Sequence, residues 1–73
     1  MNLQENPRPP EFGDRVRSLR HLAAGTIRGI SEKPLDAFEA DGTTLKMSPD
    51  QIVVVWDDGS ITAEEAEDLE ALS

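Results

Sequence analysis

The sequence predicts an all-β domain, and we expect a small five-stranded antiparallel barrel with at most a short helical turn near the C-terminus. Residues 13–17 (GDRVR) alternate polar and apolar side chains, as a half-buried strand does. Residues 53–59 (VVVWDDG) form a β-branched run that ends in a tight acidic turn. Gly25 and Gly29 stand where the strands of a small barrel must bend. With 73 residues, the chain has room for one hydrophobic core.

Residues 1–11 are expected to form a disordered N-terminal arm ahead of the barrel at residues 12–73. Pro7, Pro9 and Pro10 cannot donate a backbone hydrogen bond to a β-ladder, and the arm carries few apolar side chains. Deletion of most of this arm is therefore expected to leave the melting temperature nearly unchanged.

The strands of the barrel lie between turn-forming residues. Asp41-Gly42 is a two-residue turn signal that predicts a hairpin, and the unbroken apolar run at residues 52–56 is typical of a central strand covered on both faces. On this basis we predict strands at residues 12–19, 25–30, 37–40, 43–47, 52–56 and 60–62. Core side chains are expected from Val16, Ile27, Val53, Val55, Ile61 and Leu69, with Trp56 at least partly buried.

The C-terminal stretch admits two structures. Residues 62–65 match a capping box, and apolar residues recur at helical spacing from Ala63 to Leu72, which favours a helix. Alternatively, a single turn at residues 64–66 leads into a closing strand at residues 68–72. We adopt the turn and strand as the expectation.

The net charge of −8 lies entirely in the last third of the chain. Residues 1–46 hold all 7 basic residues and 7 of the 15 acidic ones, so residues 47–73 hold the other 8 acidic residues and no base. Such a surface repels phosphate and attracts basic partners. The same acids also serve to keep a small domain soluble.

Residues 13–17, the run Gly25-Thr26-Ile27 and residues 53–59 together resemble SH3-like barrels of the Tudor and KOW kind, over about residues 12–72. The resemblance implies a bent five-stranded barrel and a binding role. Tudor-like domains hold ligands in aromatic cages, which need several aromatic side chains. This chain has only three aromatic residues and no Tyr.

The chain is also similar to the type II, plasmid-type dihydrofolate reductases, in the first strand, in residues 25–29 and in the spacing from Gly59 to Leu69. These enzymes use a Val-Gln-Ile-Tyr strand that lines a pore between four subunits. Residues 61–64 fall at that strand, so Thr62 and Glu64 replace the Gln and the Tyr. A carboxylate there opposes an anionic cofactor and folate, so we expect no reductase activity.

Three classes of function follow from these observations. The first is a non-catalytic protein-interaction module that presents an acidic surface to a basic protein, as in nucleic-acid mimicry, or to a second copy of itself. Its partner-binding residues are expected to be Trp56, Asp57, Asp58, Glu64, Glu65 and Glu67. The second is a nucleic-acid-binding barrel that uses the stripe Arg15, Arg17, Arg20 and Arg28. The third is a diverged enzyme related to the type II reductases.

No cofactor or metal site is expected from the sequence. His21 has no partner at a catalytic or metal-binding spacing, and Asp57-Asp58-Gly59 suits a tight turn better than a cation site. The chain has no Cys, no apolar run typical of a signal peptide at its N-terminus and no stretch long enough to span a membrane. We therefore expect a cytoplasmic protein.

Overall fold

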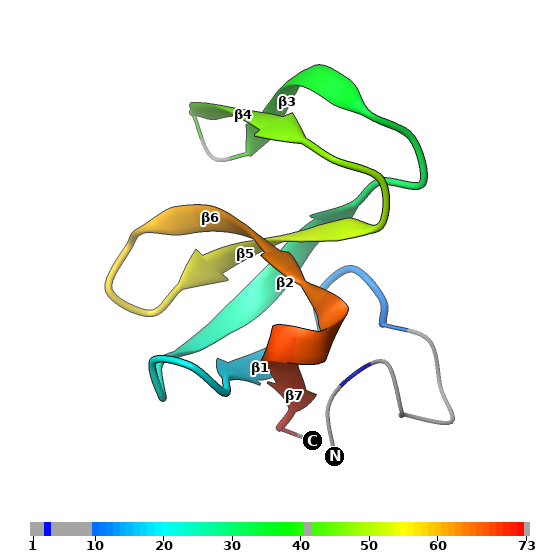
Figure 1. Ribbon diagram of the computed structural model, residues 1–73. Coiled ribbons are helices and arrows are strands. Elements are labelled where there is room, and N and C mark those ends of the chain that lie inside the picture. Colours follow the sequence, from blue (N-terminus) through cyan, green and yellow to red (C-terminus); the bar gives the residue numbers. More distant parts are fainter. Residues whose placement is uncertain (1–2, 4–9, 41, 73) are drawn as a thin grey trace.

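The structure, a computed structural model, describes residues 3, 10–40 and 42–72, and these residues form two antiparallel sheets and a 3-10 turn (Figure 1). The elements are β1 (Arg15–Ser18), β2 (Ala24–Ile30), β3 (Leu35–Ala40), β4 (Thr43–Met47), β5 (Gln51–Trp56), β6 (Ile61–Glu65), η2 (Ala66–Asp68) and β7 (Leu69–Ala71). The larger sheet has the order β6-β5-β2-β1-β7, and β3 pairs with β4 in a separate hairpin. The prediction of an all-β fold with a five-stranded antiparallel sheet is confirmed.

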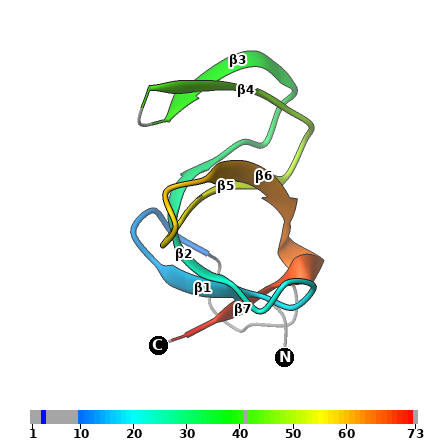
Figure 2. The same ribbon diagram turned by 90° about the vertical axis from the view of Figure 1, so that its left-hand side faces the viewer.

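The five-stranded sheet is strongly curled around a central core (Figure 2). Its edge strands are β6 and β7, and η2 connects them along the chain. Within the described part of the chain, no strand pairing joins these two edges, so the sheet is curled without closing by hydrogen bonds. The C-terminal stretch therefore forms a turn and a strand, as preferred, with the turn two residues later than predicted and β6 correspondingly longer.

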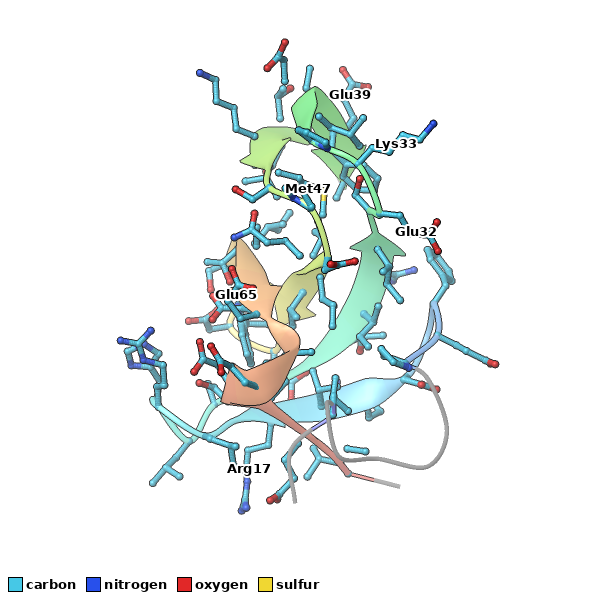
Figure 3. All side chains as sticks on the ribbon, turned by 45° about the vertical axis from the view of Figure 1, so that its right-hand side comes forward. Arg17, Glu32, Lys33, Glu39, Met47 and Glu65 are labelled. Carbon is cyan, nitrogen blue, oxygen red and sulfur yellow. The ribbon has the colours of Figure 1, made fainter. Side chains whose placement is uncertain are left out.

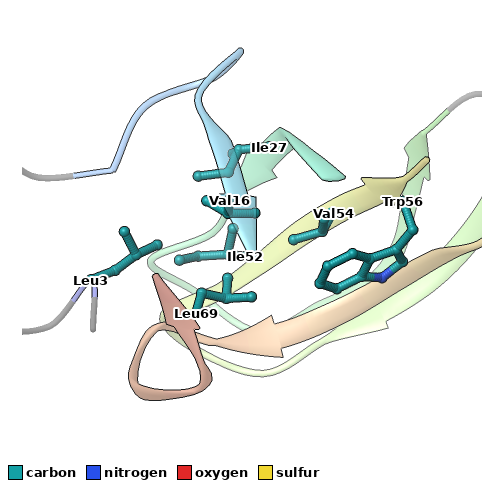
Figure 4. Close-up of a cluster of buried hydrophobic side chains, with 7 residues drawn as sticks. All are labelled: Leu3, Val16, Ile27, Ile52, Val54, Trp56 and Leu69. Carbon is teal, nitrogen blue, oxygen red and sulfur yellow. The ribbon is translucent and has the colours of Figure 1, made fainter. Parts of the chain in front are cut away.

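Strand β5 is buried on both of its faces, as its unbroken apolar run predicted. Ile52, Val54 and Trp56 point into the curled sheet. There they form the main core with Leu3, Val16, Ile27 and Leu69 (Figure 4). Val53 points the other way and packs against Ala40 and Met47 of the β3–β4 hairpin. The hairpin thus shields the outer face of the sheet.

Gly25 and Gly29 of β2 are required by close approach. A Cβ on Gly25 would lie 2.7 Å from the carbonyl oxygen of Val55, and one on Gly29 would lie 2.2 Å from the ring of Phe38. The pairing of β2 with β5 is irregular between Ile27 and Gly29. The expected bend in this strand is therefore present, and it gives Phe38 of the hairpin a place against the sheet.

The strand bounds and the burial of some side chains differ from the sequence prediction. Burial follows the alternation of side chains between the two faces of the sheet, and not the β-propensity of each residue. β1 is shorter than the predicted strand and covers only Arg15–Ser18. Val55 and Ile61 are half-buried, since they lie opposite each other on the outer face of the sheet. Ile52, Val54 and Met47 are buried core residues that the prediction omitted.

The disordered arm predicted at residues 1–11 lies largely outside the described residues. Of the part that is described, Leu3 is only 5% exposed and belongs to the main core. Within the described residues, no helix has the length and apolar character needed to cross a membrane.

Candidate partner-binding site

Three of the four arginines of the predicted stripe form ion pairs with acids of the C-terminal third. Arg15 forms a two-pronged pair with Asp57, with both N–O distances at 2.8 Å. Arg17 pairs with Glu70, its neighbour across β1 and β7, and Arg20 lies 3.7 Å from Asp68. The Arg15–Asp57 pair is exposed, whereas the acids of the other two pairs are partly buried. Ion pairs at a protein surface add little to stability.

The fourth arginine, Arg28, lies over the ring of Phe12 at 5.7 Å from its centroid, within the range of a cation–π contact. All four guanidinium groups therefore already contact a side chain of this domain. A nucleic acid would have to compete with these contacts for each of them.

Four acidic residues on or beside β6 have no cation among the described residues: Asp58, Glu64, Glu65 and Glu67. We call this set the acidic edge, because three of its members lie on the edge strand β6 or on η2, which follows it. Asp50, just before β5, and Glu32, Asp36 and Glu39, in and before β3, also have no cation among the described residues. Figure 3 shows Glu65 on the flank of the molecule formed by β6, and Arg17 at its base beside β1 and β7. Glu65, which has no cation among the described residues, and Arg17, which pairs with Glu70, thus lie on different parts of the surface.

A cavity of about 240 Å³ opens between β6 and the loop that joins β1 to β2. Two members of the acidic edge, Asp58 and Glu64, contribute carboxylates to its wall. The remaining lining residues are Ser18, His21, Ala23, Trp56, Ser60 and Thr62. The cavity therefore combines an indole, an imidazole, two carboxylates and three hydroxyl groups.

A chain of hydrogen bonds holds Glu64 at this cavity. The indole N–H of Trp56 donates to Thr62 Oγ1 at 2.7 Å, and the Thr62 hydroxyl donates to Glu64 Oε2 at 2.7 Å. Thr62 and Glu64 face the cavity because they are two residues apart on one strand and pair with Val54 and Ile52. One carboxylate oxygen of Glu64 remains available to a ligand.

Asp58 is shaped by the turn between β5 and β6. Its Oδ1 accepts hydrogen bonds from the hydroxyl and the backbone N–H of Ser60, at 2.6 and 2.9 Å. These hydrogen bonds lower the pKa of Asp58, the hydroxyl having the larger effect. In Asp57, the hydrogen bond from Arg15 lowers the pKa of the carboxyl group. Both side chains are therefore negatively charged at neutral pH.

Of the six residues predicted to bind a partner, the structure brings Trp56, Asp58 and Glu64 together at the cavity. Trp56 is only 8% exposed, so its partial burial is confirmed. Asp57 is turned toward Arg15 instead. Glu65 lies opposite Gln51, whose amide donates to it at 3.3 Å, and Glu67 is an exposed residue of η2.

Sequence analysis missed Ser18, Ser60, Thr62 and His21 as lining residues. Thr62 could have been found, because it shares a strand face with Glu64 at a spacing of two. Ser18 ends β1 and His21 lies in the loop that follows, and only the three-dimensional fold brings them to this place. The Ser18 side chain is fully buried, and its hydroxyl oxygen accepts hydrogen bonds from the backbone N–H groups of Arg20 and His21. These two hydrogen bonds shape the loop.

A second, more open groove of about 780 Å³ lies near the base of the hairpin. Its lining is mainly apolar and includes Pro10, Ile30, Leu35, Ile52 and Ala66. Ser31, Glu32, Lys33 and Asp50 complete its lining, so its two carboxylates share the groove with a lysine. It contains none of the six residues predicted to bind a partner. Among the described residues there is also no group of three or more side chains suited to hold a metal ion.

Comparison with known proteins adds no relative: no family model, no curated protein and no solved structure matches this chain.

Proposed function

We propose that this domain is a non-catalytic protein-interaction module that binds a basic protein through its acidic edge. The observation that carries the proposal is a cluster of four unpaired carboxylates at one edge of the sheet, within the described part of the chain, and two of them line a cavity. The arginines of β1 and of the following loop are matched by Asp57, Asp68 and Glu70, while Asp58, Glu64, Glu65 and Glu67 have no cation among the described residues. A cluster of uncompensated carboxylates on a rigid sheet attracts and steers a basic partner.

A DNA-binding protein is one class of basic partner that fits, in which case the acidic edge acts as a nucleic-acid mimic. The small curled sheet, with a 3-10 turn before its last strand, supports an SH3-like barrel as the fold type. The absence of cysteine supports the cytoplasm as the compartment.

The two alternatives predicted from the sequence receive less support. The arginines needed for nucleic-acid binding are engaged with Asp57, Glu70, Asp68 and Phe12. For a reductase, Glu64 would place a carboxylate at the wall of the cavity, where an anionic cofactor or folate would be repelled. Binding of double-stranded DNA at low salt and NADPH-dependent turnover of dihydrofolate are the direct tests of these alternatives.

The test of the proposed function compares two triple variants of equal charge change. In the first, Glu64, Glu65 and Glu67 are replaced by Gln. In the second, which serves as the control, Glu32, Asp36 and Glu39 near the hairpin are replaced by Gln, Asn and Gln. All six side chains except the half-buried Glu64 are exposed, so both variants are expected to fold.

Proteins captured by the immobilised wild-type domain are identified by mass spectrometry, and association rates are then measured for each. We expect the first variant to associate about tenfold more slowly at low salt, and the control to change the rate less than twofold. Raising the ionic strength should remove the difference, since charges are screened over about 8 Å at physiological salt. Equal rates for the two variants would place the interaction surface elsewhere.

A further inference from the structure

One backbone hydrogen bond at the start of β6 determines which residues of this strand pair with β5 and which point their backbone groups away from it. The N–H of Trp56 donates to the carbonyl oxygen of Ser60 at 2.8 Å, so this is a hydrogen-bonded pair of the antiparallel ladder. Such pairs alternate along a ladder. The pairs Val54–Thr62 and Ile52–Glu64 are therefore the next hydrogen-bonded pairs, given the register of the two strands.

It follows that Ile61 and Ala63 direct their backbone N–H and C=O groups away from β5. β6 is an edge strand, and no hydrogen bond joins these groups to another residue within the described part of the chain. Both residues are only partly buried. An unpaired edge of this kind is a template on which another extended chain can pair.

The charge of this edge identifies the kind of chain that fits it. Glu64 and Glu65 lie on β6 itself and Glu67 follows in η2, and none of them has a cation among the described residues. A second copy of β6 would bring its own glutamates against these, and like charges on neighbouring strands are destabilising. A basic extended segment has the opposite charge, so it is the occupant that this edge favours.

The cavity adds a place for one side chain of that segment. On adjacent strands, side chains directly opposite each other point to the same face. A residue paired with Thr62 or Glu64 would therefore direct its side chain toward the cavity that these two residues line. A lysine or arginine there would meet the carboxylates of Glu64 and Asp58.

We propose that a basic extended segment of the partner adds to the outer edge of β6 as a further strand, with a lysine or arginine side chain in the cavity beside Trp56. This inference rests on the proposed function and specifies how the acidic edge is used. Backbone hydrogen bonds to Ile61 and Ala63 supply the pairing, and the carboxylates select a cationic side chain.

The experiment uses the full chain and synthetic ten-residue peptides in which lysine alternates with valine. A second peptide carries arginine in place of lysine and separates the two sources of positive charge. A third carries acetyl-lysine, which removes the charge, and a fourth keeps the lysines but has N-methylated valine amides, which cannot pair as a strand. Binding is followed by amide exchange and chemical shifts of the labelled domain.

We expect the lysine peptide, the arginine peptide or both to bind and to protect the amides of Ile61 and Ala63 from exchange. The acetylated and N-methylated peptides are each expected to bind at least about tenfold more weakly. If the lysine and N-methylated peptides bind equally, strand addition is wrong, while attraction to an acidic surface still stands. If neither basic peptide binds, strand addition is overturned for basic segments, and the capture experiment separately decides the proposed function.

Two variants test the edge from the side of the domain. Ala63→Pro removes an N–H that makes no ladder bond to β5, a position where an edge strand tolerates proline. It should weaken the lysine peptide about tenfold. Glu64→Gln should weaken it about fivefold, against less than twofold for the matched change Glu67→Gln, which lies outside the cavity. Unchanged binding by Ala63→Pro and Glu64→Gln would overturn the inference, and the N-methylated peptide gives the same test without a variant.

Discussion

The acidic residues at the two edges of the curled sheet differ in whether they pair with an arginine. At the β7 edge, Glu70 of β7 and Asp68, the last residue of η2, lie against Arg17 and Arg20. At the β6 edge, Glu64 and Glu65 have no cation among the described residues. The β7 edge also carries Leu69, which is fully buried, whereas no residue of β6 is fully buried.

In our proposal, this difference separates the acids that stabilise the fold from those that bind a partner. Net composition alone would assign all the C-terminal acids to one negative surface. The ion pairs of β1 and β7 instead neutralise part of that charge where the chain is held together. Four of the acids that remain unpaired among the described residues lie on or beside β6, and this is the edge that we propose for a partner.

The largest expected effect concerns the core beneath the β7 edge. Leu69→Ala should lower the free energy of unfolding by about 2–5 kcal/mol, because a fully buried leucine loses its contacts and leaves a cavity. Urea denaturation monitored by circular dichroism measures this change. The control is Leu72→Ala, which removes the same atoms from a side chain that is 45% exposed. Similar losses for both variants would show that the β7 edge does not close over the core.

The second prediction concerns Leu3, which extends the same core. Leu3→Ala should lower the free energy of unfolding by about 2 kcal/mol, since Leu3 is 5% exposed and packs among the core side chains. The melting temperature of this variant and of a chain lacking residues 1–10 would fall together. If neither melting temperature changed, residues 1–10 would have no structural role, as expected from the sequence.

The third prediction compares the acids of the two edges directly. A double-mutant cycle on Arg17 and Glu70 should give a favourable coupling of about 0.5 kcal/mol, the usual size for an ion pair near the protein surface. Glu65→Gln and Glu67→Gln should leave the free energy of unfolding within about 0.5 kcal/mol of wild type. A clear loss of stability from either β6-edge variant would mean that these acids serve the fold as well.

The smallest effect is a pH dependence at Asp57. The hydrogen bond from Arg15 lowers the pKa of this carboxyl group below the value of about 3.9 for an unperturbed aspartate. The unfolded chain therefore binds the proton more readily, so the stabilisation is fully present above about pH 4 and is lost as the pH falls through the lowered pKa. Melting temperatures between pH 7 and pH 2 should fall slightly less steeply for Asp57→Asn than for wild type, and equal slopes would contradict the prediction.

The fold was largely predictable from this sequence because its turns are chemically marked. The hairpin β3–β4 and the central strand β5 follow from an Asp-Gly pair and from an unbroken apolar run, which are local signals. Leu3 and Met47 could not be assigned to a core, since their burial depends on which distant strands pair. Gly29 indicated a bend in its strand, but nothing in the sequence indicated that the ring of Phe38 packs against it.

The candidate site was predictable only in part for a similar reason. The excess of acids in the C-terminal third predicted that Asp58 and Glu64 belong to a negative surface. Which acids would pair with an arginine, as Asp57 and Glu70 do, depended on the register between strands. A distance of 42 residues along the chain separates Arg15 from Asp57. No pattern within one segment indicates such a pair, so the sequence assigned Asp57 to the binding surface.

The hydrogen bond between Trp56 and Thr62 links the fluorescence of Trp56 to the state of the cavity. The chain contains one Trp and no Tyr, so nearly all of its near-ultraviolet emission comes from a single indole. That indole is linked through Thr62 to Glu64, the carboxylate at the wall of the cavity. A cation that settles on Glu64 perturbs the electric field around the ring and, with it, the emission wavelength. Occupancy of the cavity can thus be followed by intrinsic fluorescence, with no label attached to either molecule.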